Sequence, residues 1–343
     1  MSGVGVDAIA RAAATLESGG LVAFPTETVY GLGADAENPA AVASIYRAKG
    51  RPHDHPVIVH LAPGADLAYW SDAIPVQARQ LVEAFWPGPL TLILKRAARI
   101  PADVSGGQDT VGLRCPSHPV AIALLTAFKD GRGGVAAPSA NKFGHVSPTT
   151  AQHVHDEFGQ DGSIGVILDG GQSGVGIEST ILDLSRLATH GPVLLRPGHL
   201  SAGEIAAVIG HIPLAADAGA PRTSGSLASH YAPQTPVALL PEADLAPVLA
   251  LLQARGLRVA LIHHTLVHAA AASLHLPAEP AAYAHGLYAA LRTMDRAAVD
   301  MSLELILVEA PPSTDAWQGV NDRLRRAAHG SAGVLAGLLD MHQ

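Results

Sequence analysis

The sequence predicts an α/β fold with a large twisted sheet, followed by a second and smaller α/β unit. Three observations carry this prediction. Short apolar runs alternate with amphipathic segments up to about residue 210, the pattern breaks over residues 211–236, and it resumes from residue 237. The runs are mostly Val, Ile and Leu with little alternation, which is typical of strands that are covered on both faces.

Eight apolar runs of the first part are predicted to be strands, because each is short and dominated by aliphatic residues. In chain order they are GLVAF (20–24), PVIVHL (56–61), LTLILK (90–95), TVGLR (110–114), GVAAP (134–138), GVILD (165–169), STILDL (179–184) and PVLLR (192–196).

Three helices of the first part have readable start signals: a polar N-cap followed by proline, or a capping box. The signals are Asn38-Pro39 for a helix over 39–48, Ser147-Pro148 for a helix over about 148–158, and Ser201 with Glu204 for a helix over 202–209.

The break over residues 211–236 is rich in Ala, Pro, Gly and Ser. A linker of that length inside one compact fold would be unusual, so we place a domain boundary there. The sequence thus predicts a domain over 1–210, a linker over 211–236 and a small α/β domain over 237–343. The elements expected in the last part are strands at 237–240, 258–264 and 303–309 and helices at 242–255, 281–297 and 318–328.

Composition limits the function. The chain has 343 residues and a formal net charge of -8, which argues against a broad basic face for nucleic acid but allows a local basic pocket. Its single cysteine, Cys115, excludes an intrachain disulfide and reads as a small core side chain. No run approaches the roughly 18 to 20 apolar residues that span a bilayer. We therefore expect a cytoplasmic protein without membrane contact.

The usual nucleotide and hydrolase motifs are missing: the sequence has no G-x-x-x-x-G-K-[ST], no G-x-G-x-x-G and no G-x-S-x-G. Instead, polar residues stand just beyond several predicted strands, and open α/β sheets bind ligands outside the carboxyl ends of their strands. Four of the 22 cations, Lys49, Arg51, Arg114 and Arg196, lie at such strand or helix ends. Several cations together with hydroxyls and backbone amides could bind a triphosphate without a P-loop.

Each of these residues also has a structural interpretation. Lys49 and Arg51 flank Gly50, and cations and glycine are both favoured at a helix C-terminus. Ser139 and Asn141 could simply be turn residues. The histidines at 263, 264, 268 and 275 could suggest a metal site, but none is expected because no carboxylate or thiolate joins them at suitable spacing.

Taken together, KGR (49–51) and SAN (139–141) resemble the K-x-R and S-x-N signature of the YrdC-like family. FPTETVYGLGADA, WPGPLTLIL, DTVGLRCP, AAPSAN, EST and LLRPG extend the resemblance in order over residues 7–210. SHYAP (229–233), followed by a small α/β domain, is similar to the long form of the threonylcarbamoyl-AMP synthases. The resemblance implies a YrdC-like twisted mixed sheet with flanking helices and a smaller Rossmann-like C-terminal domain.

The resemblance also implies an activity. Such enzymes are nucleotidyltransferases that join L-threonine, bicarbonate or CO2, and ATP with Mg²⁺ to give threonylcarbamoyl-AMP and pyrophosphate. Partner proteins then place the threonylcarbamoyl group on the tRNA adenosine beside the anticodon, so only weak or indirect tRNA contact is expected. No covalent side-chain nucleophile and no side-chain metal ligand are implied, because the carbamate is itself a nucleophile.

Carried over by position, the resemblance assigns two sets of binding residues. The L-threonine set is Thr26, His60, Arg114, Ser139 and Ser179. The ATP set is Lys49, Arg51, His55, Thr110, Asn141, Ser147, Arg196 and Tyr231, the last as part of a lid in the linker. His55 stands where the family usually has Asn, so its contact with ATP is expected to differ. SGSLASHYAP departs from the family's usual linker sequence but retains Tyr231, so the lid contacts before Tyr231 are expected to differ.

Two alternatives remain open at this point. Carbamoyltransferases that use carbamoyl phosphate belong to the same superfamily, but they carry cysteine-rich zinc modules that one cysteine cannot supply. An RNA-binding module is the alternative from another class, and the net charge of -8 counts against it.

Overall fold

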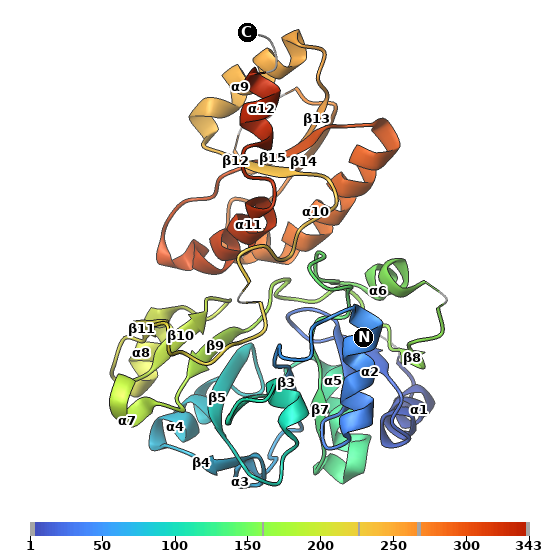
Figure 1. The fold of residues 1–343 in the computed structure, drawn as a ribbon, viewed down its shortest axis with the longest axis vertical. Helices are drawn as coiled ribbons and strands as arrows, with labels where there is room; N and C mark the ends of the chain where they lie inside the picture. The colour runs from blue at the N-terminus through green and yellow to red at the C-terminus, as the bar shows by residue number, and fades with distance from the viewer. Residues whose placement is uncertain (1–3, 160, 226, 266–268, 341–343) are drawn as a thin grey trace. The chain divides into compact units, whose positions relative to one another are not determined.

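The computed structural model describes residues 4–159, 161–225, 227–265 and 269–340 (Figure 1). The chain forms two compact units: Met1–Phe143 with Ser147–Ser226, and Gly144–Val146 with Leu227–Gln343. Both combine sheets with helices, so the predicted α/β class is confirmed. Of the segment predicted as a linker, residues up to 226 belong to the first unit and later ones to the second.

The first unit contains one mixed sheet. Its order is β11-β10-β9-β5-β6-β3-β7-β2-β1-β8, with β4 added beside β5. The strands are β1 (Val22–Phe24), β2 (Gly31–Asp35), β3 (Ile58–Leu61), β4 (Ser71–Ala73), β5 (Leu90–Arg96), β6 (Thr110–Arg114), β7 (Gly134–Ala136), β8 (Val166–Ile167), β9 (Thr180–Asp183), β10 (Val193–Arg196) and β11 (Leu214–Ala215). All eight predicted strands are present, whereas β2, β4 and β11 were not predicted.

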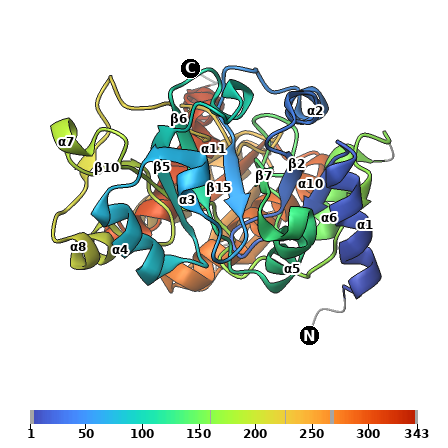
Figure 2. The same ribbon diagram turned by 90° about the horizontal axis from the view of Figure 1, so that it is seen from below.

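Helices cover this sheet on both faces. They are α1 (Val6–Glu17), α2 (Pro39–Lys49), α3 (Leu67–Trp70), α4 (Val76–Phe85), α5 (Pro119–Ala127), α6 (Ala151–Phe158), α7 (Leu187–His190) and α8 (Ala202–Ile209), with 3-10 turns η1 (Ala102–Ser105) and η2 (Phe128–Gly131). The main core joins α2, α4 and α8 to one face. A second core joins α1 and α5 to the other face, over β1 and β7, and Figure 2 shows these two helices side by side.

The predicted helix signals have different outcomes. The Asn38 side chain caps α2 by accepting from the amides of Ala40 and Ala41, and the capping box of Ser201 and Glu204 is present at α8. The prediction for Ser147 is wrong. Helix α6 begins at Ala151 with Thr150 as its N-cap. Residues 147–149 lie outside the helix because the Pro148 carbonyl accepts the amide of Tyr30, 2.9 Å away.

The second unit contains a parallel sheet in the order β12-β15-β13-β14, and helices α10 and α11 contact its strands. Its elements are β12 (Val237–Leu240), α9 (Glu242–Ala254), β13 (Val259–His263), β14 (Ala272–His275), α10 (Pro280–Met301), β15 (Leu305–Glu309), η3 (Asp315–Trp317), α11 (Gln318–His329) and α12 (Val334–Asp340). Leucines of α9, β13 and β15 form one core with α12 packed against it. Every predicted element of this part is present, and β14 and α12 were missed.

No helix within the described ranges is both long and apolar enough to cross a membrane. Of the histidines considered for a metal site, His268 lies outside the described residues. A carboxylate does approach this group, since Glu309 lies 3.4 Å from Nδ1 of His264. Even so, the described part of the chain holds no cluster of three His, Cys, Asp or Glu side chains suited to a metal ion.

Candidate active site

The predicted site residues of the central strands share one face of the sheet. Ile58 and His60 of β3 pair directly with Gly112 and Arg114 of β6. Because side chains alternate along a strand, Thr110 of β6 lies on the same face, about 13 Å from Arg114. Arg114 ends β6, as the sequence predicts, whereas Thr110, which only the family resemblance assigned to the site, begins this strand. The edge rule applies to parallel sheets, and this sheet is mixed.

The floor between the two ends of β6 is apolar. Ile58, Ile93 and Ile181 form a small buried cluster on this face. Gly112 lies among them, and a Cβ atom at this position would come within 3.1 Å of the Ile93 Cδ1 atom. The missing side chain at Gly112 is what allows the Ile93 side chain to approach the strand this closely. The face therefore offers a polar group at each end of a low apolar floor.

Arg114 is held in a buried ion pair. Its Nη2 donates to Oε1 of Glu27 at 2.7 Å, and its Nε donates to the Gly88 carbonyl at 3.3 Å. The other oxygen of Glu27 accepts the amide of Ser117 at 3.0 Å. Among the described residues, none accepts a hydrogen bond from Nη1 of Arg114. Part of the guanidinium fork thus remains for a carboxylate ligand.

His60, beside Arg114, is neutral near pH 7. Burial, followed by the charge of Arg114, lowers the pKa of His60 to about 3. Its ring packs edge-on against Phe24, with the centroids 6.0 Å apart. Within the described ranges no group hydrogen-bonds its buried Nδ1. A neutral imidazole with a free nitrogen can donate or accept one hydrogen bond, as its tautomer requires.

Replacing His60 with glutamine is expected to reduce the acid sensitivity of folding. Since the pKa is about 3 in the folded state and 6.5 when exposed, the unfolded chain binds one proton more between these values. The free energy of unfolding therefore falls as the pH drops below 6.5, by about 2 kcal/mol at pH 5. Urea unfolding of His60→Gln and parent at pH 7 and pH 5 measures this difference.

A Trp317→Phe background restricts the fluorescence signal in that experiment to Trp70 and Trp86 of the first unit. The parent should lose about 2 kcal/mol more than His60→Gln between the two pH values. Equal losses in the two proteins would contradict the assignment of a buried neutral histidine.

The two signature motifs, K-x-R and S-x-N, are joined by Lys49. Helix α2 ends at Lys49, and Gly50 adopts a left-handed conformation with φ 64° that turns the chain. The buried Lys49 ammonium donates to the Ser139 carbonyl at 2.5 Å and also to the Asn141 carbonyl. Burial, and then Arg51, hold the pKa of Lys49 well below its usual value. Lys49 thus fixes the loop that carries both serine and asparagine.

Arg51 and His55 both contact the ring of Phe143. Arg51 donates from Nη2 to the Pro56 carbonyl at 2.8 Å, and its guanidinium lies 5.9 Å from the centre of Phe143. His55 contacts Phe143 edge-on, with the centroids 5.4 Å apart. Burial and the charge of Arg51 lower the pKa of His55, so this ring is uncharged at neutral pH.

A third group of site residues surrounds Ser179. Its hydroxyl lies 2.8 Å from that of Thr91 on β5, and Arg196 donates to both its carbonyl and its hydroxyl. Arg196 also donates to the Ser224 carbonyl at 2.9 Å. Arg196 is therefore fixed between the start of β9 and a segment late in the first unit.

Several predicted residues serve mainly in local hydrogen bonds. The Thr26 hydroxyl closes a turn by donating to the Val29 carbonyl at 2.6 Å. Ser147 donates to Oε1 of Glu178 at 2.5 Å, which replaces the helix-cap role expected from the sequence. Tyr231 belongs to the second unit, where its ring is buried against Tyr288 and lies 5.4 Å from the Arg323 guanidinium.

Two acidic residues of the site were missed from the sequence. Glu27 lies within PTETVYGLG and Glu178 directly before Ser179, so both stood inside motifs that had been singled out. The available signal was physical: a buried cation such as Arg114 needs an anionic partner, and the carboxylates inside the quoted motifs were the candidates. Cys115, by contrast, is buried as predicted, and burial raises its pKa to about 11.

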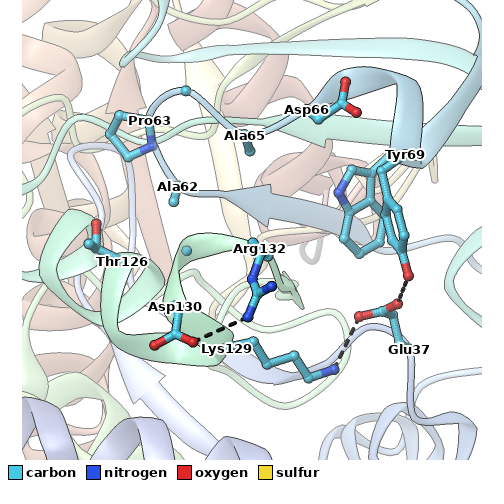
Figure 3. A pocket seen from close by; sticks show the side chains of 13 residues that line it. Glu37, Ala62, Pro63, Ala65, Asp66, Tyr69, Thr126, Lys129, Asp130 and Arg132 are labelled. Atoms are coloured by element: carbon cyan, nitrogen blue, oxygen red, sulfur yellow. Dashed lines mark hydrogen bonds and ion pairs between the residues drawn. The ribbon is translucent and has the colours of Figure 1, made fainter.

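A hollow of about 880 Å³ lies elsewhere in the first unit (Figure 3). Most of its charged groups already have partners in the lining: Lys129 pairs with Glu37, which also accepts from Tyr69, and Asp130 pairs with Arg132. None of the predicted site residues lines it. Its size alone gives no reason to place the chemistry there.

Comparison with known proteins identifies relatives of both parts of the chain. The family described as Telomere recombination, of Sua5, YciO and YrdC proteins, matches residues 14–198. The family described as threonylcarbamoyl-AMP synthase, C-terminal domain, matches residues 200–329.

Similar whole proteins are known as well. The threonylcarbamoyl-AMP synthase of Bacillus subtilis is 41% identical and matches 94% of this chain and 93% of its own. That of Pyrococcus abyssi is 38% identical, with 92% and 93% covered. The crystal structure of P. abyssi Sua5 complexed with L-threonine matches with a TM-score of 0.85 at 38% identity, covering 93% of this chain and 94% of that one.

Proposed function

Because the chain belongs to the threonylcarbamoyl-AMP synthase family, in the form with a C-terminal domain, we propose that it condenses L-threonine, CO2 or bicarbonate, and ATP. The products are threonylcarbamoyl-AMP and pyrophosphate, which makes the enzyme a nucleotidyltransferase. The observation that carries the proposal is the sheet face on which Arg114 and His60 lie at one end of β6 and Thr110 at the other.

The proposed reaction has two bond-forming steps. The threonine amine adds to CO2 and loses a proton, which gives a carbamate. A carbamate oxygen then attacks the α-phosphorus of ATP, and the bond from that phosphorus to the leaving pyrophosphate breaks. Since the carbamate is already an anionic nucleophile, the chain needs to align the reactants and neutralise charge rather than supply a covalent nucleophile.

The described side chains support these tasks. The free part of the Arg114 fork suits the threonine carboxylate, and the uncharged His60 beside it can hydrogen-bond a polar group of the amino acid. Ser139 and Ser179 are proposed to contact the same substrate. Arg51, His55, Thr110, Asn141, Ser147 and Arg196 are proposed to contact ATP, and Lys49 holds the loop that carries Ser139 and Asn141.

Mg²⁺ is proposed to enter with ATP, where it would neutralise phosphate charge. This suits the donor set of the site: its carboxylates, Glu27 and Glu178, are already engaged with Arg114 and Ser147. The side chains of the chain are therefore assigned to the phosphates and the amino acid, and not to the metal ion.

The product is proposed to pass to separate tRNA-modifying machinery, in which another protein transfers the threonylcarbamoyl group. The net charge of -8 supports weak or indirect contact with tRNA by this chain. A site of action in the cytoplasm fits the single buried cysteine, because a reducing compartment does not favour disulfides.

The decisive experiment is pyrophosphate release from ATP with and without L-threonine and bicarbonate. Release should require both, and the adenylate should appear in equal amount. Release that does not depend on L-threonine would contradict the proposed function.

We also propose that the segment around Tyr231 closes over the bound substrates, because the product is a reactive mixed anhydride that water would hydrolyse. Tyr231→Ala is expected to slow pyrophosphate release and to shorten the adenylate lifetime, each by roughly 10-fold. Chromatography of the adenylate against time measures both. Tyr231→Phe keeps the ring that packs on Tyr288 and is the control; normal adenylate lifetime in Tyr231→Ala would refute the lid.

A further inference from the structure

We infer that Glu27 is a positioning residue that sets the affinity for L-threonine by orienting the Arg114 guanidinium; this rests on the proposed function. Glu27 stands in the loop after β1, far from Arg114 in sequence, yet its Oε1 lies 2.7 Å from Nη2 of that arginine. Both groups are largely buried, with side-chain exposures of 11% for Glu27 and 4% for Arg114.

Glu27 is itself fixed by the backbone on two sides. Its Oε2 accepts the amide of Ser117 at 3.0 Å, and its carbonyl accepts the amide of Val175 at 2.6 Å. Ser117 follows the end of β6, so the carboxylate connects the loop after β1 to the segment that carries Arg114. A carboxylate held in this way has a fixed position, from which it accepts the hydrogen bond of the Arg114 guanidinium.

Arg114 is consequently held at two points of its planar fork. The Gly88 carbonyl accepts from Nε and the Glu27 carboxylate accepts from Nη2, while no group of the described structure accepts from Nη1. A guanidinium fixed in plane and direction loses little rotamer entropy when it binds a carboxylate. Without Glu27, the arginine would be free to turn away from the substrate, and its buried charge would lack a partner.

Charge balance explains why the partner is an acid rather than a carbonyl. A free amino acid is a zwitterion with no net charge. An uncompensated arginine would favour any small anion, whereas an Arg114–Glu27 pair is neutral before the substrate arrives. Threonine can then bind without leaving a net positive charge buried in the site.

The test compares Glu27→Gln with Glu37→Gln as a matched control. Glu37 also pairs with a cation of the first unit, Lys129, at 3.1 Å, but it lies away from the site. Glu27→Gln is expected to raise the KM for L-threonine by about 10- to 100-fold, as for loss of a charge-assisted hydrogen bond. The KM for ATP should change by less than about twofold, and Glu37→Gln should change neither.

A second comparison distinguishes positioning from a general loss of structure. If Glu27 acts through Arg114, the effect of Glu27→Gln should be small in an Arg114→Lys background, because the residue it orients is already altered. Glu27→Asp keeps the charge and should recover part of the threonine affinity. If thermal unfolding shows that Glu27→Gln does not fold, the KM comparison is made with Glu27→Asp instead.

The inference is overturned if Glu27→Gln leaves the KM for L-threonine unchanged or raises the KM values for L-threonine and ATP alike. It is also overturned if Glu27→Gln raises the KM for L-threonine by the same factor in the Arg114→Lys background as in the parent. Calorimetric titration of L-threonine into each full-length protein separates this result from the proposed function. A parent protein that binds L-threonine but releases no pyrophosphate contradicts the proposed function alone. The effect of Glu27 on the dissociation constant is then still measured, and no binding by the parent overturns both.

Discussion

Arg51→Ala is expected to abolish measurable release of pyrophosphate, with a fall in kcat/KM of at least about 100- to 1,000-fold. Arg51 is one of the few cations of the site, and phosphate chemistry without a P-loop depends on such groups to neutralise the triphosphate. Its backbone amide bonds the Tyr46 carbonyl at 3.0 Å beyond the end of α2, so the helix and the turn at Gly50 fix where the side chain starts. Steady-state pyrophosphate release at saturating L-threonine measures the effect.

Two further variants interpret that result. Arg51→Lys keeps the charge but loses the planar fork, and should retain an intermediate activity. Arg132→Ala removes an arginine whose side chain is 83% exposed and should act like the parent. Thermal unfolding of all three shows whether the fold survives. An Arg51→Ala enzyme with nearly normal turnover and ATP affinity would refute the role of the K-x-R motif.

L-Alanine is expected to be a very poor substrate, with kcat/KM lower than that of L-threonine by about 10⁴-fold or more. A site that hydrogen-bonds a substrate hydroxyl leaves its own buried polar groups unpaired when the hydroxyl is missing. The hydroxyls of Ser179 and Thr91 are buried on the site face and suit such a role. Amino-acid-dependent pyrophosphate release measures the ratio.

Two other amino acids divide this selectivity into its parts. L-Serine keeps the hydroxyl and lacks only a methyl group, so its kcat/KM should be lower than that of L-threonine by about 10- to 200-fold. L-Valine has the volume of threonine without the hydroxyl and should be rejected nearly as strongly as alanine. If alanine and threonine were used equally well, threonine would not be the substrate.

The sequence-based predictions succeeded where local patterns agree with the tertiary structure. Aliphatic runs such as 90–95 became strands, since a buried strand needs apolar residues on both faces. The N-cap at Asn38 and the capping box at Ser201 are present because their hydrogen bonds lie within a few residues of each other. Such contacts require no information from distant parts of the chain.

Strand β2 shows why local patterns fail elsewhere. GLGAD is poor in β-forming residues, yet it pairs with β1 and β7 in the interior of the sheet. A Cβ atom on Gly33 would lie 2.7 Å from Cγ1 of Val135. The glycine is required by close packing against a strand about 100 residues away. The β-strand propensity of a short segment contains no information about such a distant contact. The prediction of a helix starting after Ser147 was wrong for the same reason: the Pro148 carbonyl accepts a hydrogen bond from the distant Tyr30 amide, and the helix starts later.

By itself, the sequence determined the α/β class, most strands and helices, and the signature residues of the family, because these depend on local order and on motifs that can be read along the chain. Only the tertiary structure decided which groups meet. It placed Lys49 on the carbonyls of Ser139 and Asn141 and Glu27 on Arg114. A buried charge needs a compensating partner, and that partner can lie anywhere along the chain, so no period or spacing in the sequence identifies it.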